Sequence, residues 1–171
     1  MSESLGKKAE GQIKRWLDRP EDGYSFNRLY DQMTGYYMVS RNPCDFICYK
    51  YPYMYYIEAK ETEKDRFEFR NITQTQHDEL LKKEKIPGCF GIVIILFTSY
   101  KRTFIVRMSD IAKLESQKKM SLNILKESKW GIPHAEIPTI PNSRKLMLDY
   151  VGELDEIMQS AGLLNIQPRK S

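Results

Sequence analysis

The chain has 171 residues, enough for one domain that buries a hydrophobic core of its own. Its 41% hydrophobic and 12% aromatic content excludes an intrinsically disordered protein, and its longest apolar run, residues 91–97, is too short to span a bilayer. The net charge of +4 permits nucleic-acid binding without requiring it. Because the polar N-terminus lacks the apolar stretch of a signal peptide, we expect a cytoplasmic protein.

Three cysteines, an odd number, indicate reduced thiols rather than a disulfide framework. Cys44 and Cys48 with His77 or His134 are residue types that bind zinc, but their spacing is not that of a zinc finger. We interpret these cysteines as ordinary packed side chains.

The first part of the chain begins with a predicted helix over residues 4–17, which the Pro and Gly of 19–23 end. Residues 24–40 are ambiguous. A helical turn over 26–30 and a strand over 35–39 both fit this stretch.

A hairpin follows, with strands predicted over 45–49 and 54–60 and a tight turn over 51–53. A charged loop, 61–66, leads to a helix over 73–85, which Pro87 and Gly88 stop.

Residues 91–97 are apolar at every position but the first, so they predict a central strand covered on both faces. A neighbouring strand is expected over 103–108, then a helix from Ser109 or Asp110 to about residue 116. Residues 118–140 look irregular, and residues 143–158 have the spacing of an amphipathic helix. This order predicts an α/β fold with a mixed β-sheet flanked by helices.

Asp45, Glu58 and Lys60 carry the candidate chemistry. Glu58 and Lys60 are two residues apart, so both leave the same face of a strand, while Ile57 and Ala59 point to the opposite, packed face. Asp45, from the preceding strand, is placed to meet Glu58 across the hairpin. Two carboxylates suit Mg²⁺, and an adjacent ammonium suits the charge that develops on a phosphate during hydrolysis.

The Glu-x-Lys spacing alone is weak evidence, because Glu127-Ser128-Lys129 repeats it in a polar stretch without a partner Asp. The alternative is an exposed hairpin edge on which Glu58 and Lys60 are ordinary solvated charges. The spacing leaves both interpretations open.

Several motif residues resemble those of the RecU-type Holliday-junction resolvases, a family of the PD-(D/E)xK nuclease superfamily. The run Glu58-Ala59-Lys60-Glu61-Thr62 is similar to that family's signature, and Asp45-Phe46, Phe67, Asn71 and Gln76 extend the similarity. Residues 148–151 resemble the family's C-terminal segment. The resemblance covers about residues 42–154.

The resemblance implies a restriction-endonuclease-like fold in which Asp45, Glu58 and Gln76 hold Mg²⁺, or alternatively Mn²⁺. Lys60 would stabilise the transition state or position water. Glu10, on the first helix, matches a glutamate that related nucleases bring near the metal, although an exposed helix carboxylate explains it equally well.

The chain departs from the family in two places. The family has a threonine two residues before the Asp, where this chain has Pro43. The family also has a long β-hairpin stalk that enters the junction centre, and the interval 18–42 is too short for a comparable stalk.

Two residue types near the motif have simpler explanations than function. His77 is expected on a helix surface rather than as a general base. We expect packing rather than base stacking from the tyrosines of the hairpin, which are Tyr49, Tyr51, Tyr53, Tyr55 and Tyr56.

We therefore expect a single nuclease domain over residues 1–165 with a loose tail, 166–171, acting on branched DNA as a homodimer without a membrane partner. One alternative is a phage or restriction-like nuclease that cuts duplex, flap or single-stranded DNA. Another is a DNA-binding module that keeps the nuclease fold without turnover.

Overall fold

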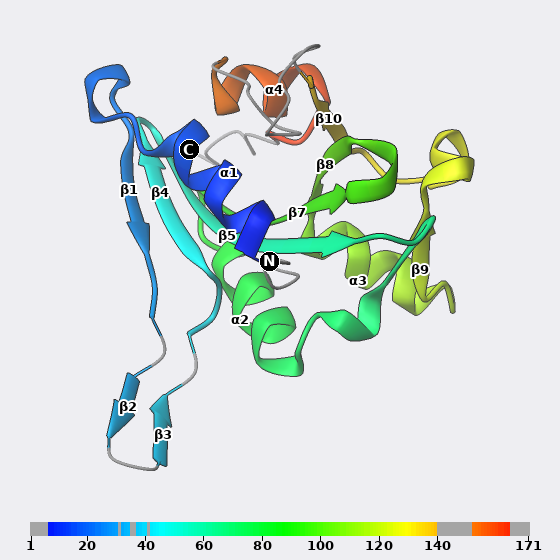
Figure 1. Ribbon diagram of the computed structural model, residues 1–171, viewed down its shortest axis with the longest axis horizontal. Coiled ribbons are helices and arrows are strands. Elements are labelled where there is room, and N and C mark those ends of the chain that lie inside the picture. Colours follow the sequence, from blue (N-terminus) through cyan, green and yellow to red (C-terminus); the bar gives the residue numbers. More distant parts are fainter. Residues whose placement is uncertain (1–6, 31, 35–36, 41, 140–151, 165–171) are drawn as a thin grey trace, which may run out of the picture.

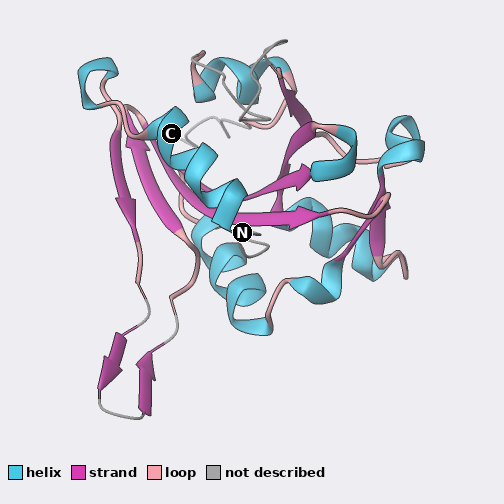
Figure 2. Ribbon diagram, viewed as in Figure 1, coloured by secondary structure: helices cyan, strands magenta, loops and turns pink. Residues whose placement is uncertain are grey.

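A mixed β-sheet with helices on both faces forms the body of the protein (Figures 1 and 2). The computed structural model describes residues 7–30, 32–34, 37–40, 42–139 and 152–164. The α/β class predicted from the sequence is confirmed.

The α-helices of the described chain are α1 (Lys7–Leu17), α2 (Gln74–Glu84), α3 (Met108–Ser116) and α4 (Leu154–Ser160). The strands are β1 (Ser25–Arg28), β2 (Gln32–Thr34), β3 (Tyr37–Ser40), β4 (Phe46–Lys50), β5 (Tyr53–Thr62), β6 (Arg66–Glu68), β7 (Cys89–Phe97), β8 (Arg102–Arg107), β9 (Ser121–Asn123) and β10 (Ala135–Ile137). Short 3₁₀ turns lie at Pro20–Asp22, Phe69–Asn71, Thr98–Tyr100 and Ile124–Lys129.

The main sheet has six strands in the order β1-β4-β5-β7-β8-β10. Only β5 and β7 run parallel, and the other neighbours are antiparallel. The crossover from β5 to β7 carries α2, as parallel neighbours require. Strand β5 therefore lies between its antiparallel hairpin partner and the most buried strand of the sheet.

Two apolar clusters lie on opposite faces of this sheet. Strand β7 supplies both, because Ile92 and Ile94 point into the cluster under α1 and α4, while Val93 and Ile95 point into the cluster under α2 and α3. The predicted central strand, covered on both faces, is confirmed.

Helix α2 packs so closely on β7 that only glycine fits at the contact. A Cβ added to Gly91 would lie 2.6 Å from the backbone oxygen of Leu80 on α2. Thr73 is the N-cap of this helix, which agrees with the start expected at residue 73. Close packing and capping together fix where the first turn of α2 lies on the sheet.

Three local expectations were wrong. The helical turn considered for 26–30 is strand β1, which is held in extended conformation by its pairing with β4. Neither Ser109 nor Asp110 caps α3, because that helix begins at Met108 with Arg107 before it. The stretch 118–140 is not simply irregular, since it contributes β9 and β10, each paired with a distant strand.

The expectation about the stalk needs a correction too. Strands β2 and β3 pair antiparallel and form a hairpin that projects away from the body beyond β1 and β4 (Figure 1). We call the two described strands the arm. The interval that looked too short for a stalk therefore does contain a projecting hairpin, because strands of three and four residues suffice for one.

Some expectations fall outside the described residues, among them the tail 166–171, the segment 148–151 and most of the helix expected over 143–158. Its described end contains α4 (Leu154–Ser160). No helix among the described residues is long and apolar enough to cross a membrane.

Candidate active site

The candidate site lies where β4 leaves the edge of β5. Pairing between these strands ends at Phe46 and Ile57, so the C-terminal half of β5 has β7 on one side only. Asp45 covers part of this open edge, because its Oδ2 accepts a hydrogen bond of 2.8 Å from the backbone N–H of Ala59. The carboxylate of Asp45 is thereby held next to Glu58 and Lys60.

Glu58 is the most buried charged residue of the described chain, with 2% of its surface exposed. Its Oε1 accepts hydrogen bonds from Lys60 Nζ at 2.9 Å and from Gln76 Nε2 at 2.7 Å. Its Oε2 is buried and accepts no hydrogen bond from the described residues. A buried carboxylate oxygen left without a donor is costly, and a ligand at this position would remove the cost.

The electrostatics of the site disfavour two negative charges. Burial, followed by repulsion from Asp45, raises the pKa of Glu58 to about 7, and Lys60 offsets part of that rise. A cation bound between Asp45 and Glu58 would stabilise the form in which both carboxylates are ionised.

Gln76 connects the site to helix α2. Its side-chain oxygen accepts a hydrogen bond of 3.0 Å from Thr73 N, and Gln76 N donates to Thr73 Oγ1, which completes a capping box. The same oxygen accepts from Lys60 Nζ at 3.3 Å. One amide therefore both begins the helix and holds Glu58 and Lys60.

Glu10 approaches from the other face of the sheet, on α1. It forms an ion pair with Arg28 of β1. Burial and then repulsion from Asp45 raise the pKa of Glu10, so its carboxylate lies within electrostatic range of the site. It is therefore not a simple exposed helix carboxylate.

The five residues predicted from the sequence thus converge on one edge of β5. Their side chains come from both faces of the sheet, since α2 supplies Gln76 and α1 supplies Glu10. Ile57 and Ala59 are buried in the cluster under α1, as predicted for the packed side of the strand. The alternative of a solvated hairpin edge is wrong for Glu58, which is buried.

The competing tripeptide lies elsewhere. Glu127 and Lys129 belong to a 3₁₀ turn, where Glu127 bonds His134 at 2.5 Å. His77 faces α3 and contacts Glu115 at 3.2 Å, and it has no contact with Glu58 among the described interactions.

Most of the cysteines and hairpin tyrosines are packed side chains, as expected from the sequence. Cys44 and Cys48 are free and buried. Tyr55 is fully buried and stacks on Phe90, whereas Tyr51 at the hairpin turn remains 79% exposed.

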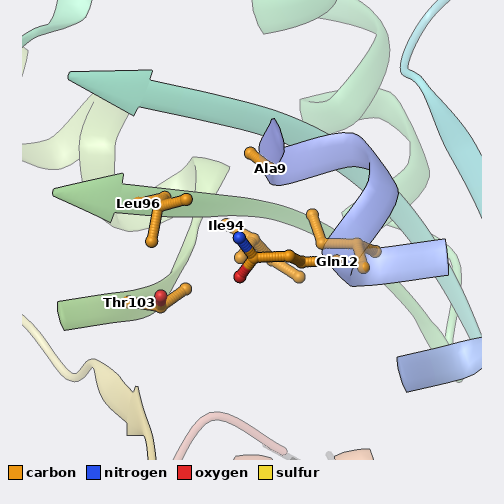
Figure 3. A pocket seen from close by; sticks show the side chains of 6 residues that line it. Ala9, Gln12, Ile94, Leu96 and Thr103 are labelled. Atoms are coloured by element: carbon orange, nitrogen blue, oxygen red, sulfur yellow. The ribbon is translucent and has the colours of Figure 1, made fainter. Parts of the chain in front are cut away.

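A narrow pocket between α1 and strands β7 and β8 is a different location (Figure 3). Its lining residues are Ala9, Gln12, Ile13, Ile94, Leu96 and Thr103. The lining carries no carboxylate, cation or nucleophilic thiol, so it offers no group for phosphate chemistry.

The donor set at the β5 edge fits a divalent cation. Among the described residues no group of three or more histidine, cysteine, aspartate and glutamate side chains is arranged to hold a metal. The predicted set has a different composition, with Asp45 and Glu58 as carboxylates and Gln76 as an amide, whose oxygen accepts from Thr73 N and Lys60 Nζ in this structure. The buried Glu58 Oε2 without a donor, beside a second carboxylate, is the observation in favour of the fit.

Sequence reasoning missed two charged neighbours of the site. Arg28 pairs with Glu10, and Glu61 Oε2 accepts a hydrogen bond of 3.1 Å from Ala9 N in the first turn of α1. The sequence identified Glu61 only as part of the run from Glu58 to Thr62, without its contact to α1. Arg28 gave no signal, because nothing in a sequence indicates that residues 10 and 28 meet.

Comparison with known proteins places these residues in a family context. A family model described as RecU, Recombination protein U, matches residues 24–156, which include Asp45, Glu58, Lys60 and Gln76 but not Glu10. No curated protein matches the chain. Among solved structures, the Holliday junction resolvase Hjc of Archaeoglobus fulgidus is similar, with 16% identity, a TM-score of 0.47, and coverage of 69% of this chain and 88% of that one.

Proposed function

The chain belongs to the RecU recombination protein family, and from that premise we propose that it is a Mg²⁺-dependent DNA endonuclease that cuts branched recombination intermediates at the Asp45–Glu58 site. The family accounts for the class, a metal-dependent endonuclease. The choice of Mg²⁺, the site residues and the homodimer are part of the proposal.

The observation that carries the site assignment is the buried carboxylate of Glu58 beside the partly buried carboxylate of Asp45. Glu58 and Asp45 repel each other in a desolvated position, and Glu58 Oε2 has no hydrogen-bond donor among the described residues. Such an arrangement costs free energy unless a cation binds there.

In this proposal Asp45, Glu58 and Gln76 hold the ion. When bound, the ion neutralises charge on the scissile phosphate and makes a coordinated water more acidic. Ala59 N fixes the orientation of the Asp45 carboxylate. Gln76, rigid because it also caps α2, fixes the orientation of Glu58.

Lys60 supplies the positive charge of the chain itself. Its side chain is 19% exposed, and Glu58 and Gln76 hold its ammonium at a defined place. From there it donates a charged hydrogen bond to a phosphate oxygen whose negative charge grows in the transition state.

Carboxylate substitutions test the site. Asp45→Asn and Glu58→Gln should abolish Mg²⁺-dependent cleavage while DNA binding and folding stay nearly intact, because only the charge of the cation site is removed. Cleavage of a labelled four-way junction, with and without Mg²⁺, is the measurement. Wild-type rates in either variant would show that the active site lies elsewhere.

The two lysines of the Glu-x-Lys repeats provide a matched control in the same assay. Lys60→Ala should lower the rate on the order of 10²–10³-fold, the scale for losing one transition-state donor. Lys129→Ala, on the distant 3₁₀ turn, should change it little. Equal losses would contradict the role of Lys60.

The substrate class distinguishes this proposal from its alternatives. A branched-DNA nuclease cuts a four-way junction faster than matched linear duplex, flap or single-stranded DNA, whereas a restriction-like enzyme does not. A non-catalytic binding module cuts none of them, whatever the metal.

We further propose that the active form is a homodimer, since symmetric resolution needs two cuts related by a two-fold axis. Analytical ultracentrifugation of the DNA-free chain should give twice the monomer mass of 20.2 kDa. A monomer both free and on a junction would contradict this.

A further inference from the structure

The ion pair between Glu10 and Arg28 lies at the rim of the proposed cation site. Arg28 is on β1, opposite Phe46, and the next backbone N–H, that of Leu29, donates to Asp45 O at 2.8 Å. The strand that carries the arginine is thus fastened to the residue beside the site.

Two aromatic rings hold the guanidinium in place. Its carbon lies 5.8 Å from the centroid of Phe46 and 5.2 Å from that of Tyr30. Between these rings Arg28 reaches Glu10 on α1. Cation–π contacts of this kind orient an arginine that would otherwise sample many rotamers.

The charges around Glu10 and Glu58 are unbalanced. Glu10 experiences repulsion from Asp45 and Glu61, and Glu58 experiences repulsion from Asp45 and Glu10. The attractive charges acting on the two glutamates are Arg28 and Lys60, respectively. Four carboxylates and two cations leave a net negative charge, which attracts a divalent ion.

We infer that Arg28 is a positioning residue that holds the carboxylate of Glu10 at the rim of the site and neutralises the attraction of that carboxylate for a cation, thereby lowering the affinity of the site for divalent cations. This inference rests on the proposed function, because it requires a cation at Asp45 and Glu58. Arg28 stabilises the metal-free protein by offsetting repulsion, and it weakens metal binding to the same site.

The chain contains a matched pair that lacks the metal site. Arg102 is also on a strand, also lies over a phenylalanine ring, 4.9 Å from the centroid of Phe104, and also bonds a glutamate, Glu136, at 2.7 Å. Its side chain is 37% exposed, against 39% for Arg28. If loss of an arginine–glutamate ion pair by itself changed Mn²⁺ affinity, substitution of Arg28 and of Arg102 would therefore change it equally.

The test is Mn²⁺ binding to the DNA-free, full-length chain, measured from the loss of the free-Mn²⁺ signal in electron paramagnetic resonance. Mn²⁺ takes the same oxygen ligands as Mg²⁺. Arg28→Gln should tighten Mn²⁺ binding on the order of tenfold, or about 1.4 kcal/mol. Arg28→Lys, which keeps the charge, should bind nearly as the wild type does, and Arg102→Gln should not differ from it.

The inference is overturned if Arg28→Gln binds Mn²⁺ with the affinity of Arg102→Gln, or if Arg28→Lys tightens binding as much as Arg28→Gln. Should Arg28→Gln fail to fold, Glu10→Gln carries the test, because it removes a carboxylate and frees the arginine. Weaker Mn²⁺ binding supports the inference, and unchanged binding contradicts it. Failure of the proposed function would look different, since the wild type itself would bind no Mn²⁺ and the inference would fall with it.

Discussion

Single side chains at this site perform two tasks at once, and Gln76 is the clearest example. Its oxygen completes the capping box of α2, and its amide N–H₂ group donates to Glu58. A capping box accepts either glutamate or glutamine at this position. The capping task alone therefore does not require the amide, whereas holding an ionised Glu58 does.

Gln76→Glu should separate these tasks. The helix cap is retained, but a further negative charge replaces the donor to Glu58, so the metal-free protein should melt at a lower temperature. Mg²⁺ should raise the melting temperature of this variant more than that of the wild type, because a ligand of the folded state stabilises it by mass action.

Thr73→Ala is the control for that experiment. It removes the cap, at a cost of about 0.5–2 kcal/mol, without changing the charge of the site. Its melting temperature should fall by a similar amount with or without Mg²⁺. If Gln76→Glu shows the same Mg²⁺-induced rise as the wild type, Gln76 does not adjoin a cation site.

At the scale of elements, α2 and α3 are joined by a partly buried acid, Glu84. Glu84, the last residue of α2, accepts hydrogen bonds from Ser109 N at 2.8 Å and Ser109 Oγ at 3.3 Å in the first turn of α3. Burial raises the pKa of Glu84 to about 7, although the bonds from Ser109 oppose the shift. Burial of Glu84 therefore favours the protonated carboxyl and outweighs the hydrogen bonds from Ser109, which favour the ionised form.

The sign of the resulting pH dependence follows from this raised pKa. Between about pH 4.5 and 7 the folded state binds the proton of Glu84 more tightly than the unfolded state, so the free energy of unfolding falls as the pH rises. The loss is complete above pH 7 and amounts to at most roughly 3 kcal/mol.

Glu84→Gln should remove this part of the pH dependence, because the amide oxygen still accepts from Ser109 and carries no charge. Urea unfolding at pH 5 and pH 8 is the measurement, with Glu79→Gln, which alters a surface ion pair with Lys82, as the control. If the difference between the two pH values is as large in Glu84→Gln as in the control, burial of this carboxylate does not cause it.

At the scale of the whole molecule, the arm bears on whether the protein recognises DNA by its branched shape or only by its phosphate charge. It projects from the body at the end of β1 and β4 (Figure 1). Contacts with phosphates weaken with salt in the same way on any DNA, since each releases counterions. We expect a projecting hairpin to respond instead to the geometry of a branch point.

Replacing residues 31–41 by a short glycine-containing turn should therefore leave the sheet folded while reducing the preference for a four-way junction over linear duplex to about tenfold or less. The full chain should keep a larger preference as salt rises. Competitive binding at several salt concentrations measures both. If removal of the arm leaves the preference unchanged, junction recognition belongs to the body of the protein.

Local rules predicted much of this protein from its sequence. The apolar run of β7 could only be a strand covered on both faces, and the two-residue spacing of Glu58 and Lys60 required a common face. The helix expected from residue 73 begins there because Thr73 and Gln76 form a capping box within four consecutive residues. In each case the determining interactions join residues close in sequence.

Only the tertiary structure decided the rest, because the interactions involved join distant residues. The open edge of β5 exists since β4 turns away after Phe46, and no local pattern encodes that divergence. The strands β9 and β10 are three residues each and become strands only by pairing with β6 and β8. Arg28 meets Glu10 because β1 and α1 pack beside the same edge, so the charge balance of the site is a property of the fold.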